Sequence, residues 1–266
     1  MNESATQEAA RLIWTHWQAG QVLDALPQAC RPANRAEGHA IQAQLPLVSG
    51  RGVEGWKIAA TSTVGQAHIG VSGPLAGRLL AGQVAADGAT VPSAGNRMRV
   101  AEPEFAFRFG RDLAPRATPY GMAEVLDAVY TLHPALEVPD SRYADFAHAG
   151  EAQLLADNAC AHRFVLGPAA PADWRDVDLR AHPVHGRVSG ASGSHLSREG
   201  TGAAVLGDPR VALTWLVNEL SALGLTLQAG QIVTTGTCMT PLEIEPGDSV
   251  TADYGRLGCV SMRFAA

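Results

Sequence analysis

From Gly52 onward the chain is a succession of short apolar runs that Gly and Pro interrupt, and this pattern constrains its fold more than any other feature. Short runs of this kind, rich in branched and aromatic side chains, predict buried strands. The runs do not alternate strictly with helical segments, and no glycine-rich turn of the dinucleotide-binding type occurs in the sequence. We therefore expect a β-rich α+β domain and not a doubly wound sheet. The clearest predicted strands are Phe105–Phe109, Arg163–Leu166, Ile232–Thr235 and Cys259–Phe264.

The first fifty residues have a helical pattern instead. Apolar side chains recur with helical spacing over residues 4–17, and Asn34 with Glu37 three residues later resembles a capping box. We interpret residues 1–51 as a small helical N-terminal cap and residues 52–266 as the main domain.

Two further helices are expected inside the main domain. Asp208 and Pro209 suit an N-cap and a first helical turn, and the apolar pattern that follows them ends at Gly224. A second helix is predicted over about residues 120–132. The stretch from 168 to 178 is expected to be an exposed connection.

Charge and composition exclude several classes of function. The formal net charge of −6 with 20 basic residues argues against a nucleic-acid binder, which needs a surplus of Lys and Arg to neutralise phosphates. No apolar run has the length of roughly 20 residues that a membrane-spanning helix needs, and the first residues do not resemble a signal peptide. We expect a cytoplasmic protein without a nucleic-acid or membrane partner. The four scattered cysteines are expected to be reduced thiols that fill the interior: Cys30, Cys160, Cys238 and Cys259.

Carboxylates are the first sign of chemistry in the sequence. The segment V-A-E-P-E-F-A-F-R-F places Glu102 and Glu104 two residues apart, so both side chains leave one face of a strand. Such a pair is unfavourable unless a cation, a shared proton or bulk water separates the charges. Glu137, at the end of another expected strand, could join them, and oxygen-only ligation suits Mg²⁺, Mn²⁺ or Ca²⁺. The alternative is a set of solvated carboxylates, with Asp140 and Arg142 forming a local ion pair.

Several segments, taken together and in order, resemble the fumarylacetoacetate hydrolase superfamily, in particular its hydratase and decarboxylase branch. The similarity covers about residues 52–264. The segments are G-W-K-I-A-A-T-S from Gly55, E-P-E-F-A-F from Glu102, E-V-P-D-S-R-Y from Glu137, A-D-N-A from Ala156, L-G-D-P from Leu206, T-T-G-T from Thr234, P-G-D from Pro246 and L-G-C-V-S-M-R-F from Leu257.

The resemblance implies a fold and a site. The fold would be a mixed β-roll with flanking helices, and the protein would be a homo-oligomer. The metal ligands would be Glu102, Glu104 and Glu137, which would bind Mg²⁺ or Mn²⁺. Lys57 would contact the substrate and, with Glu104, act in catalysis. The substrate carboxylate would lie beside a turn made of Thr235, Gly236 and Thr237.

The same resemblance implies a lyase that acts on a small 2-oxoalkenoate. The preferred activity is the hydration of 2-hydroxypenta-2,4-dienoate (2-oxopent-4-enoate) in the meta-cleavage catabolism of aromatic compounds. One departure matters, because Leu75 stands where related hydratases often carry an aspartate, so Lys57 or Glu104 would have to move the proton. The alternatives are a 4-oxalocrotonate-type decarboxylase, an acylpyruvate C–C hydrolase, and a non-catalytic binding or assembly subunit.

Other polar groups have weaker claims. Asp157 and Asn158 either fix a local turn or support the metal ligands. His148, His162 and His195 are not expected to act in catalysis, because the sequence gives none of them a partner. The stretch from Ser189 to His195 is expected to be a flexible glycine-serine loop and not a nucleophile turn.

Overall fold

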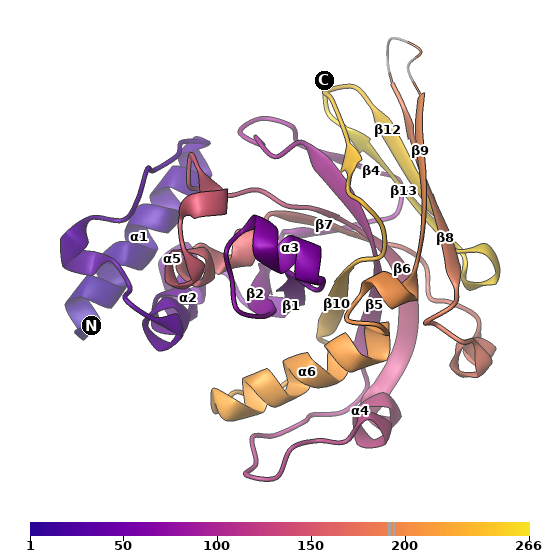
Figure 1. The fold of residues 1–266 in the computed structure, drawn as a ribbon, viewed down its shortest axis with the longest axis horizontal. Helices are drawn as coiled ribbons and strands as arrows, with labels where there is room; N and C mark the ends of the chain where they lie inside the picture. Colours follow the sequence, from indigo (N-terminus) through magenta and orange to yellow (C-terminus); the bar gives the residue numbers. More distant parts are fainter. Residues whose placement is uncertain (191–192, 194) are drawn as a thin grey trace.

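The computed structural model describes residues 1–190, 193 and 195–266 (Figure 1). In this part of the chain the larger of two sheets has eight strands, in the order β2-β1-β10-β5-β6-β7-β3, with β11 beside β5. Most pairs are antiparallel, but β1 with β10 and β3 with β7 are parallel, so the sheet is mixed. The strands are β1 (Val53–Ala59), β2 (Leu75–Leu80), β3 (Val84–Ala86), β5 (Val100–Phe109), β6 (Val129–Val138), β7 (Arg163–Leu166), β10 (Ile232–Thr237) and β11 (Leu242–Glu243).

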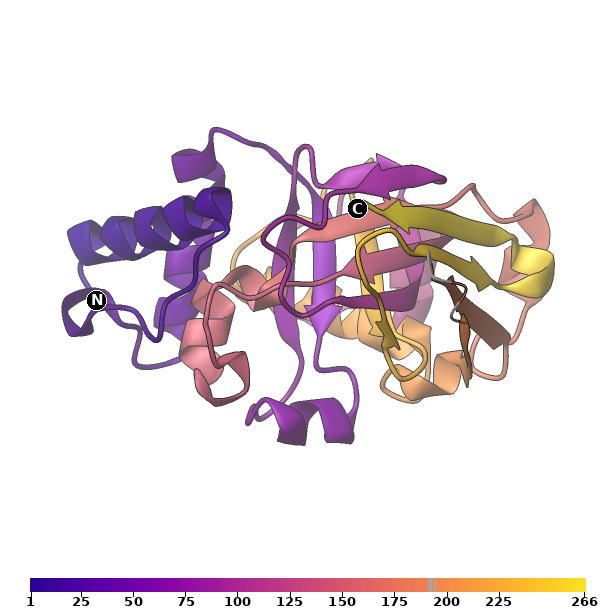
Figure 2. The same ribbon diagram turned by 90° about the horizontal axis from the view of Figure 1, so that it is seen from above.

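The smaller sheet lies against the larger one and completes the β-rich body (Figure 2). Its order is β4-β13-β12-β8-β9, with bounds β4 (Ala89–Val91), β8 (Pro183–Ser189), β9 (His195–Thr201), β12 (Ser249–Asp253) and β13 (Cys259–Phe264). Side chains of both sheets share one buried core, in which the rings of Phe105 and Tyr254 meet edge to face at 5.2 Å. The expected β-rich α+β fold and the four predicted strands are confirmed.

Helices form a lobe at one end of the molecule, drawn at the left of Figure 1. It contains α1 (Glu3–Ala19), α2 (Arg35–Ser49) and α5 (Glu151–Ala156). Ile13 and Ile41 of the N-terminal segment pack with Tyr143 and Ala156 in one buried cluster. The cap therefore shares a core with later residues, and the boundary at residue 51 stays a prediction. At the start of α2 the Asn34 side chain accepts from the Glu37 amide, which confirms half of the predicted capping box.

The two predicted interior helices had different outcomes. α6 (Pro209–Ala222) has Asp208 as its N-cap and is followed by Gly224 in the left-handed region, as expected. The helix predicted over residues 120–132 is present as α4 (Met122–Ala128), but its predicted end was wrong, because β6 begins at Val129. Residues of β6 pair with β5 on one side and β7 on the other, and this pairing overrides the local helical pattern.

Smaller elements refine three other expectations. The connection over 168–178 contains a short helix, η4 (Ala172–Asp176), whose Trp174 is buried against Phe107, so it is not exposed throughout. All four cysteines are free thiols, but Cys259 is exposed and does not fill the interior, because its side chain leaves the outer face of β13. The glycine-serine stretch links β8 to β9, and residues 191, 192 and 194 lie outside the described part.

The remaining elements are α3 (Thr63–His68) and the short helices η1 (Gln28–Cys30), η2 (Phe146–His148), η3 (Asn158–Cys160), η5 (Gly202–Ala204) and η6 (Gly255–Leu257). Within the described residues, no helix has both the length and the apolar composition to cross a membrane.

Candidate metal centre

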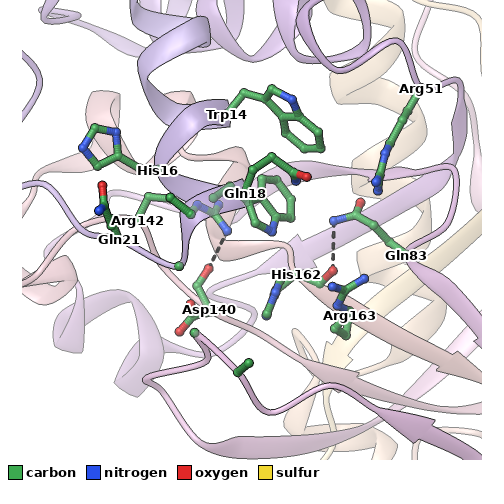
Figure 3. Close-up of a pocket in the computed structure, with 15 residues that line it drawn as sticks. Trp14, His16, Gln18, Gln21, Arg51, Gln83, Asp140, Arg142, His162 and Arg163 are labelled. Carbon is green, nitrogen blue, oxygen red and sulfur yellow. Dashed lines mark hydrogen bonds between the residues drawn. The ribbon is translucent and has the colours of Figure 1, made fainter.

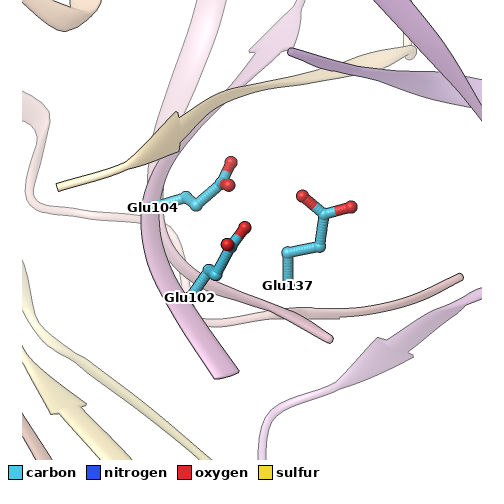
Figure 4. Close-up of side chains that lie close together, drawn as sticks. All are labelled: Glu102, Glu104 and Glu137. Carbon is cyan, nitrogen blue, oxygen red and sulfur yellow. The ribbon is translucent and has the colours of Figure 1, made fainter. Parts of the chain in front are cut away.

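Three carboxylates meet on the face of β5 and β6. The antiparallel register sets Glu102 opposite Glu137, and Glu104 follows two residues along β5 on the same face. One oxygen of each side chain lies within 4.8 Å of the others (Figure 4). Glu104 and Glu137 are completely buried, whereas Glu102 is partly exposed. The expected convergence is therefore present, and bulk water does not separate the two buried charges.

Several oxygens of this cluster have no protein partner. Glu104 Oε2 accepts hydrogen bonds from the Thr234 hydroxyl and, at 2.8 Å, from the Gly236 amide. Among the described residues, Glu104 Oε1 and Glu137 Oε2 are buried without a partner, and Glu137 Oε1 has only the Lys57 ammonium at 3.2 Å, outside hydrogen-bond geometry. Buried carboxylate oxygens in this state are costly, and a hard cation is the partner that their chemistry fits. The donor set therefore suits a divalent metal ion.

Burial and mutual repulsion shift the acidity of the cluster. Burial and the charge of Glu137, opposed by the charge of Lys57, together raise the pKa of Glu102 to about 7. Burial likewise raises the pKa of Glu104 well above its ordinary value and raises that of Glu137. Without a cation, the three groups thus give up their protons less readily than ordinary glutamates do.

Lys57 lies beside this cluster and is only 2% exposed, so it is not an ordinary surface lysine. Its Nζ is 3.2 Å from Glu137 Oε1 and donates a hydrogen bond to the Ala159 carbonyl at 3.0 Å. Burial lowers the pKa of Lys57, but the charges of the three glutamates outweigh it and leave the pKa raised. The group is a buried ammonium held between a carboxylate and a main-chain carbonyl.

The carbonyl that holds Lys57 belongs to a strained turn. Asn158, Ala159 and Cys160 all have left-handed backbones, with φ of 58°, 52° and 60°. Each such residue other than glycine costs about 1–2 kcal/mol. The side chain of Asn158 compensates by accepting from the Arg78 amide at 2.7 Å and donating to the Arg78 carbonyl at 2.8 Å. Asn158 was a candidate from the sequence, but the role of this turn in placing the Ala159 carbonyl was not predicted.

Gly77 makes room for this arrangement. It pairs with Lys57 across β1 and β2. A Cβ at this position would lie 2.4 Å from the Asn158 carbonyl oxygen and 3.0 Å from Lys57 Cδ. Glycine is therefore required where the lysine and the turn approach the sheet.

The segment from Thr234 to Thr237 supports Glu104 from β10. The Thr235 hydroxyl donates to the Phe105 carbonyl at 3.0 Å, and the Thr237 hydroxyl donates to the Met239 carbonyl at 2.9 Å. Gly236 has φ of +96°, and a Cβ there would lie 2.2 Å from Thr61 Oγ1. The substrate-binding role of Thr235, Gly236 and Thr237 stays a prediction. The hydroxyl of Thr234, which donates to Glu104, was not among the predicted site groups.

The remaining candidates have structural partners. Arg142 pairs with Asp157, and it reaches Asp140 only at the main-chain carbonyl. The ion pair between Asp140 and Arg142 that belonged to the alternative interpretation is therefore not formed. Leu75 is completely buried in an apolar cluster with Leu154 and Ala159, and it places no titratable group beside β1.

The three histidines lie outside the carboxylate cluster, as expected. His148 is exposed beside Asp145, and His162 is buried 3.2 Å from the Asn96 amide nitrogen. His195 is exposed at the start of β9.

Comparison with known proteins agrees with this geometry. Residues 80–265 match the family described as fumarylacetoacetate (FAA) hydrolase C-terminal. The chain belongs to this family. A member of the family from Paraburkholderia xenovorans (strain LB400), named 2-keto-4-pentenoate hydratase, is 33% identical over 99% of this chain and 96% of its own length. A 4-oxalocrotonate decarboxylase from Pseudomonas putida is 33% identical over 81% of this chain and 78% of its own.

A solved structure extends the likeness to the fold. It is the 4-oxalocrotonate decarboxylase from Pseudomonas putida G7, complexed with magnesium and adipate. The TM-score is 0.86 with 26% identity, and the match covers 99% of this chain and 98% of that one. The helical lobe and the β-rich body are thus both part of the shared fold.

Proposed function

We propose that this protein is a divalent-metal-dependent lyase that hydrates 2-hydroxypenta-2,4-dienoate, the 2-keto-4-pentenoate of its relatives' names. The observation that carries the proposal is the carboxylate cluster, in which Glu104 Oε1 and Glu137 Oε2 are buried without a partner. Full-length similarity to named 2-keto-4-pentenoate hydratases supports the choice of reaction.

Glu102, Glu104 and Glu137 would hold Mg²⁺ or Mn²⁺, since all three offer oxygen and one oxygen from each lies within 4.8 Å of the others. The ion would supply a Lewis acid for the head of a 2-oxo acid. The solved decarboxylase that contains magnesium supports this assignment.

Lys57 would orient the substrate and move a proton. An ammonium has three N–H donors, and here one reaches the Ala159 carbonyl and another faces Glu137. The third is available to a substrate oxygen. Because Leu75 leaves no acid on β2, Lys57 and the unpartnered Oε1 of Glu104 are the groups proposed to exchange protons with the substrate.

The turn of Thr235, Gly236 and Thr237 is proposed to hold the substrate carboxylate. The Gly236 amide and the two hydroxyls already donate to protein oxygens, and a carboxylate has only acceptors, so binding would exchange these bonds for bonds to the substrate. Lys57, beside them on the neighbouring β1, would add the positive charge that a carboxylate needs.

Decarboxylation of 4-oxalocrotonate is the second candidate. It is supported by the TM-score of 0.86 with a decarboxylase and by the apolar Leu75. Both reactions would use the same 2-oxo acid head, so the candidate site alone does not choose between them.

The deciding experiment gives the purified, Mg²⁺-supplied protein each substrate in turn while absorbance and released CO₂ are recorded. We expect the dienoate absorbance to decay without CO₂. CO₂ from 4-oxalocrotonate with a stable dienoate would replace the first candidate by the second. Turnover should disappear in Glu104→Gln and persist in Glu54→Gln, an exposed glutamate on β1. If neither substrate reacts, both lyase activities are contradicted.

We also propose that the protein works in the cytoplasm as a homo-oligomer, without a nucleic-acid or membrane partner. The family resemblance supports the oligomer, and the net charge of −6 disfavours polyanionic partners. Light scattering coupled to gel filtration should give a multiple of 27.8 kDa, and a single-chain mass would contradict the oligomer.

A further inference from the structure

A second site candidate is a cavity of about 270 Å³ beside the C-terminal half of α1 (Figure 3). Trp14 and Trp17 of α1 form one side. Arg51, Gln83 and Arg163 form another. Neither Lys57 nor a glutamate of the carboxylate cluster is among the described residues that line this cavity.

The charges around the cavity do not balance. Of its three arginines, Arg142 is paired with Asp157. Asp140, the acidic residue of the wall, already accepts from the Arg97 and Met98 amides at 2.8 and 3.1 Å. The other two arginines of the wall are Arg51 and Arg163.

Arg51 and Arg163 lack counter-charges. Among the residues that the structure describes, neither forms an ion pair; Arg51 approaches the Ala81 carbonyl at 3.4 Å and lies over the Trp14 ring, 5.2 Å from its centre. The Nε of Arg163 is buried without a hydrogen-bond partner. Burial lowers the pKa of Arg163, and the neighbouring charge of Arg51 lowers it further. A guanidinium has only donors, so the unpartnered Nε of Arg163 needs an acceptor from outside the chain.

The backbone keeps the α1 side of the cavity close to the facing loop. Gly20, at the end of α1, has φ of +61°, and Gly95 has φ of +80°. A Cβ on Gly20 would lie 3.2 Å from Gly95 Cα. Both glycines also line the cavity, and their conformations suit a residue without a side chain.

We propose that this cavity binds a small dianion that carries carboxylate or phosphate groups, held by the forked donors of Arg51 and Arg163. Planar guanidinium groups match both kinds of oxyanion in pairs of hydrogen bonds. The volume suits a small metabolite or inorganic phosphate and excludes a folded partner. The site is independent of the proposed lyase activity. It is nevertheless joined to the carboxylate cluster through the sheet, because Arg163 and Phe164 of β7 pair with Val138 and Glu137 of β6.

The test titrates the full chain with inorganic phosphate and, separately, with succinate, followed by calorimetry. We expect saturable binding of one anion per chain by at least one probe, and which probe binds identifies the source of the oxyanion. Arg163→Gln and Arg51→Gln should each weaken binding by about tenfold or more, because each removes charge-assisted hydrogen bonds. Arg187→Gln, an exposed arginine of β8, is the matched control and should leave binding unchanged.

Tryptophan fluorescence gives a local readout, since Trp14 and Trp17 line the cavity. The anion should change the emission of the wild type and have little effect on a variant with both replaced by Phe. If Arg163→Gln unfolds, as circular dichroism would reveal, Arg51→Gln still carries the test. The proposal is overturned if neither probe binds, if binding survives both arginine variants, or if Glu104→Gln abolishes it and so places the anion at the carboxylate cluster.

Discussion

Two buried groups of charged side chains differ in how completely their charges and hydrogen bonds are matched. Arg142 and Asp157 form a pair of one positive and one negative charge. Asp157 also accepts from the Ser141 hydroxyl and the Arg142 amide, and the guanidinium binds the carbonyls of Asp140 and Ala161. The carboxylate cluster instead sets three carboxyl groups against the single ammonium of Lys57 and leaves Glu104 Oε1 and Glu137 Oε2 buried without a partner.

The difference separates structure from chemistry. A buried pair whose donors and acceptors are all matched can hold a fold together without any ligand. A buried cluster with excess charge and unmatched oxygens is costly unless a further group completes it. Both groups are buried, so burial alone does not distinguish them. The completeness of their hydrogen bonding distinguishes the structural pair from the candidate site.

The largest effect should come from breaking the complete pair. Asp157→Asn leaves the buried Arg142 charge uncompensated, and loss of one partner of such a pair typically costs about 3–5 kcal/mol. Urea unfolding should therefore show a much lower midpoint for this variant. A free energy of unfolding within about 1 kcal/mol of the wild-type value would show that this pair does not stabilise the fold as expected.

The incomplete cluster should respond in the opposite way. Glu137→Gln removes one of three repelling carboxylates, so the metal-free variant should unfold no earlier than the metal-free wild type. Its affinity for Mn²⁺ should fall by more than about 100-fold, because a ligand is lost outright. Calorimetric titration and urea unfolding measure the two effects separately. Strong destabilisation with unchanged Mn²⁺ affinity would assign Glu137 a structural role.

The turn that holds Lys57 predicts a smaller and more specific effect. Asn158→Ala removes two hydrogen bonds to Arg78 and places alanine, which tolerates the left-handed region less well than asparagine, at a φ of 58°. The change should cost about 1–3 kcal/mol and displace the Ala159 carbonyl. We expect kcat to fall about tenfold or more while Mn²⁺ affinity is unchanged.

Asn218→Ala is the control for that variant. Asn218 makes the same kind of paired contact, accepting from the Tyr120 amide and donating to its carbonyl, but on α6 and outside the cluster. It should lose comparable stability and keep its kcat. Equal losses of kcat in both variants would mean that Asn158 acts only through stability.

The smallest expected effect is on the pH dependence of stability. The pKa of Glu102 is about 7 in the folded, metal-free protein against an ordinary 4.5, so the folded state binds the extra proton. This contribution is complete below the unfolded pKa and is lost as pH rises through the folded one. The melting temperature of the metal-free protein should therefore fall between about pH 5 and about pH 8. Glu102→Gln should flatten the decline, and an unchanged slope would contradict the shift.

The sequence allowed part of this account to be predicted. The two-residue spacing of Glu102 and Glu104 on a strand predicted a shared face, and the convergence of Glu137 followed from the family resemblance. The Asp208 cap also appeared as predicted. The shared face of Glu102 and Glu104 and the Asp208 cap depend on local spacing and on short-range hydrogen bonds, which a sequence displays directly.

Other features depended on contacts that a single sequence does not display. The residues after α4 form β6 because β5 and β7 pair with them. Asp157, not Asp140, neutralises Arg142 because the end of α5 places the Asp157 side chain against the guanidinium. The roles of Thr234 and the Ala159 carbonyl depend equally on partners far away in the chain. Tertiary pairing decided each of these cases.

The most direct test of the central claim is a crystal structure of the protein grown with Mn²⁺, with an anomalous difference map. The account predicts one strong peak at coordination distance, about 2–2.5 Å, from an oxygen of each of Glu102, Glu104 and Glu137. No peak there, or a peak bound by other residues while these oxygens remain unliganded, would contradict it.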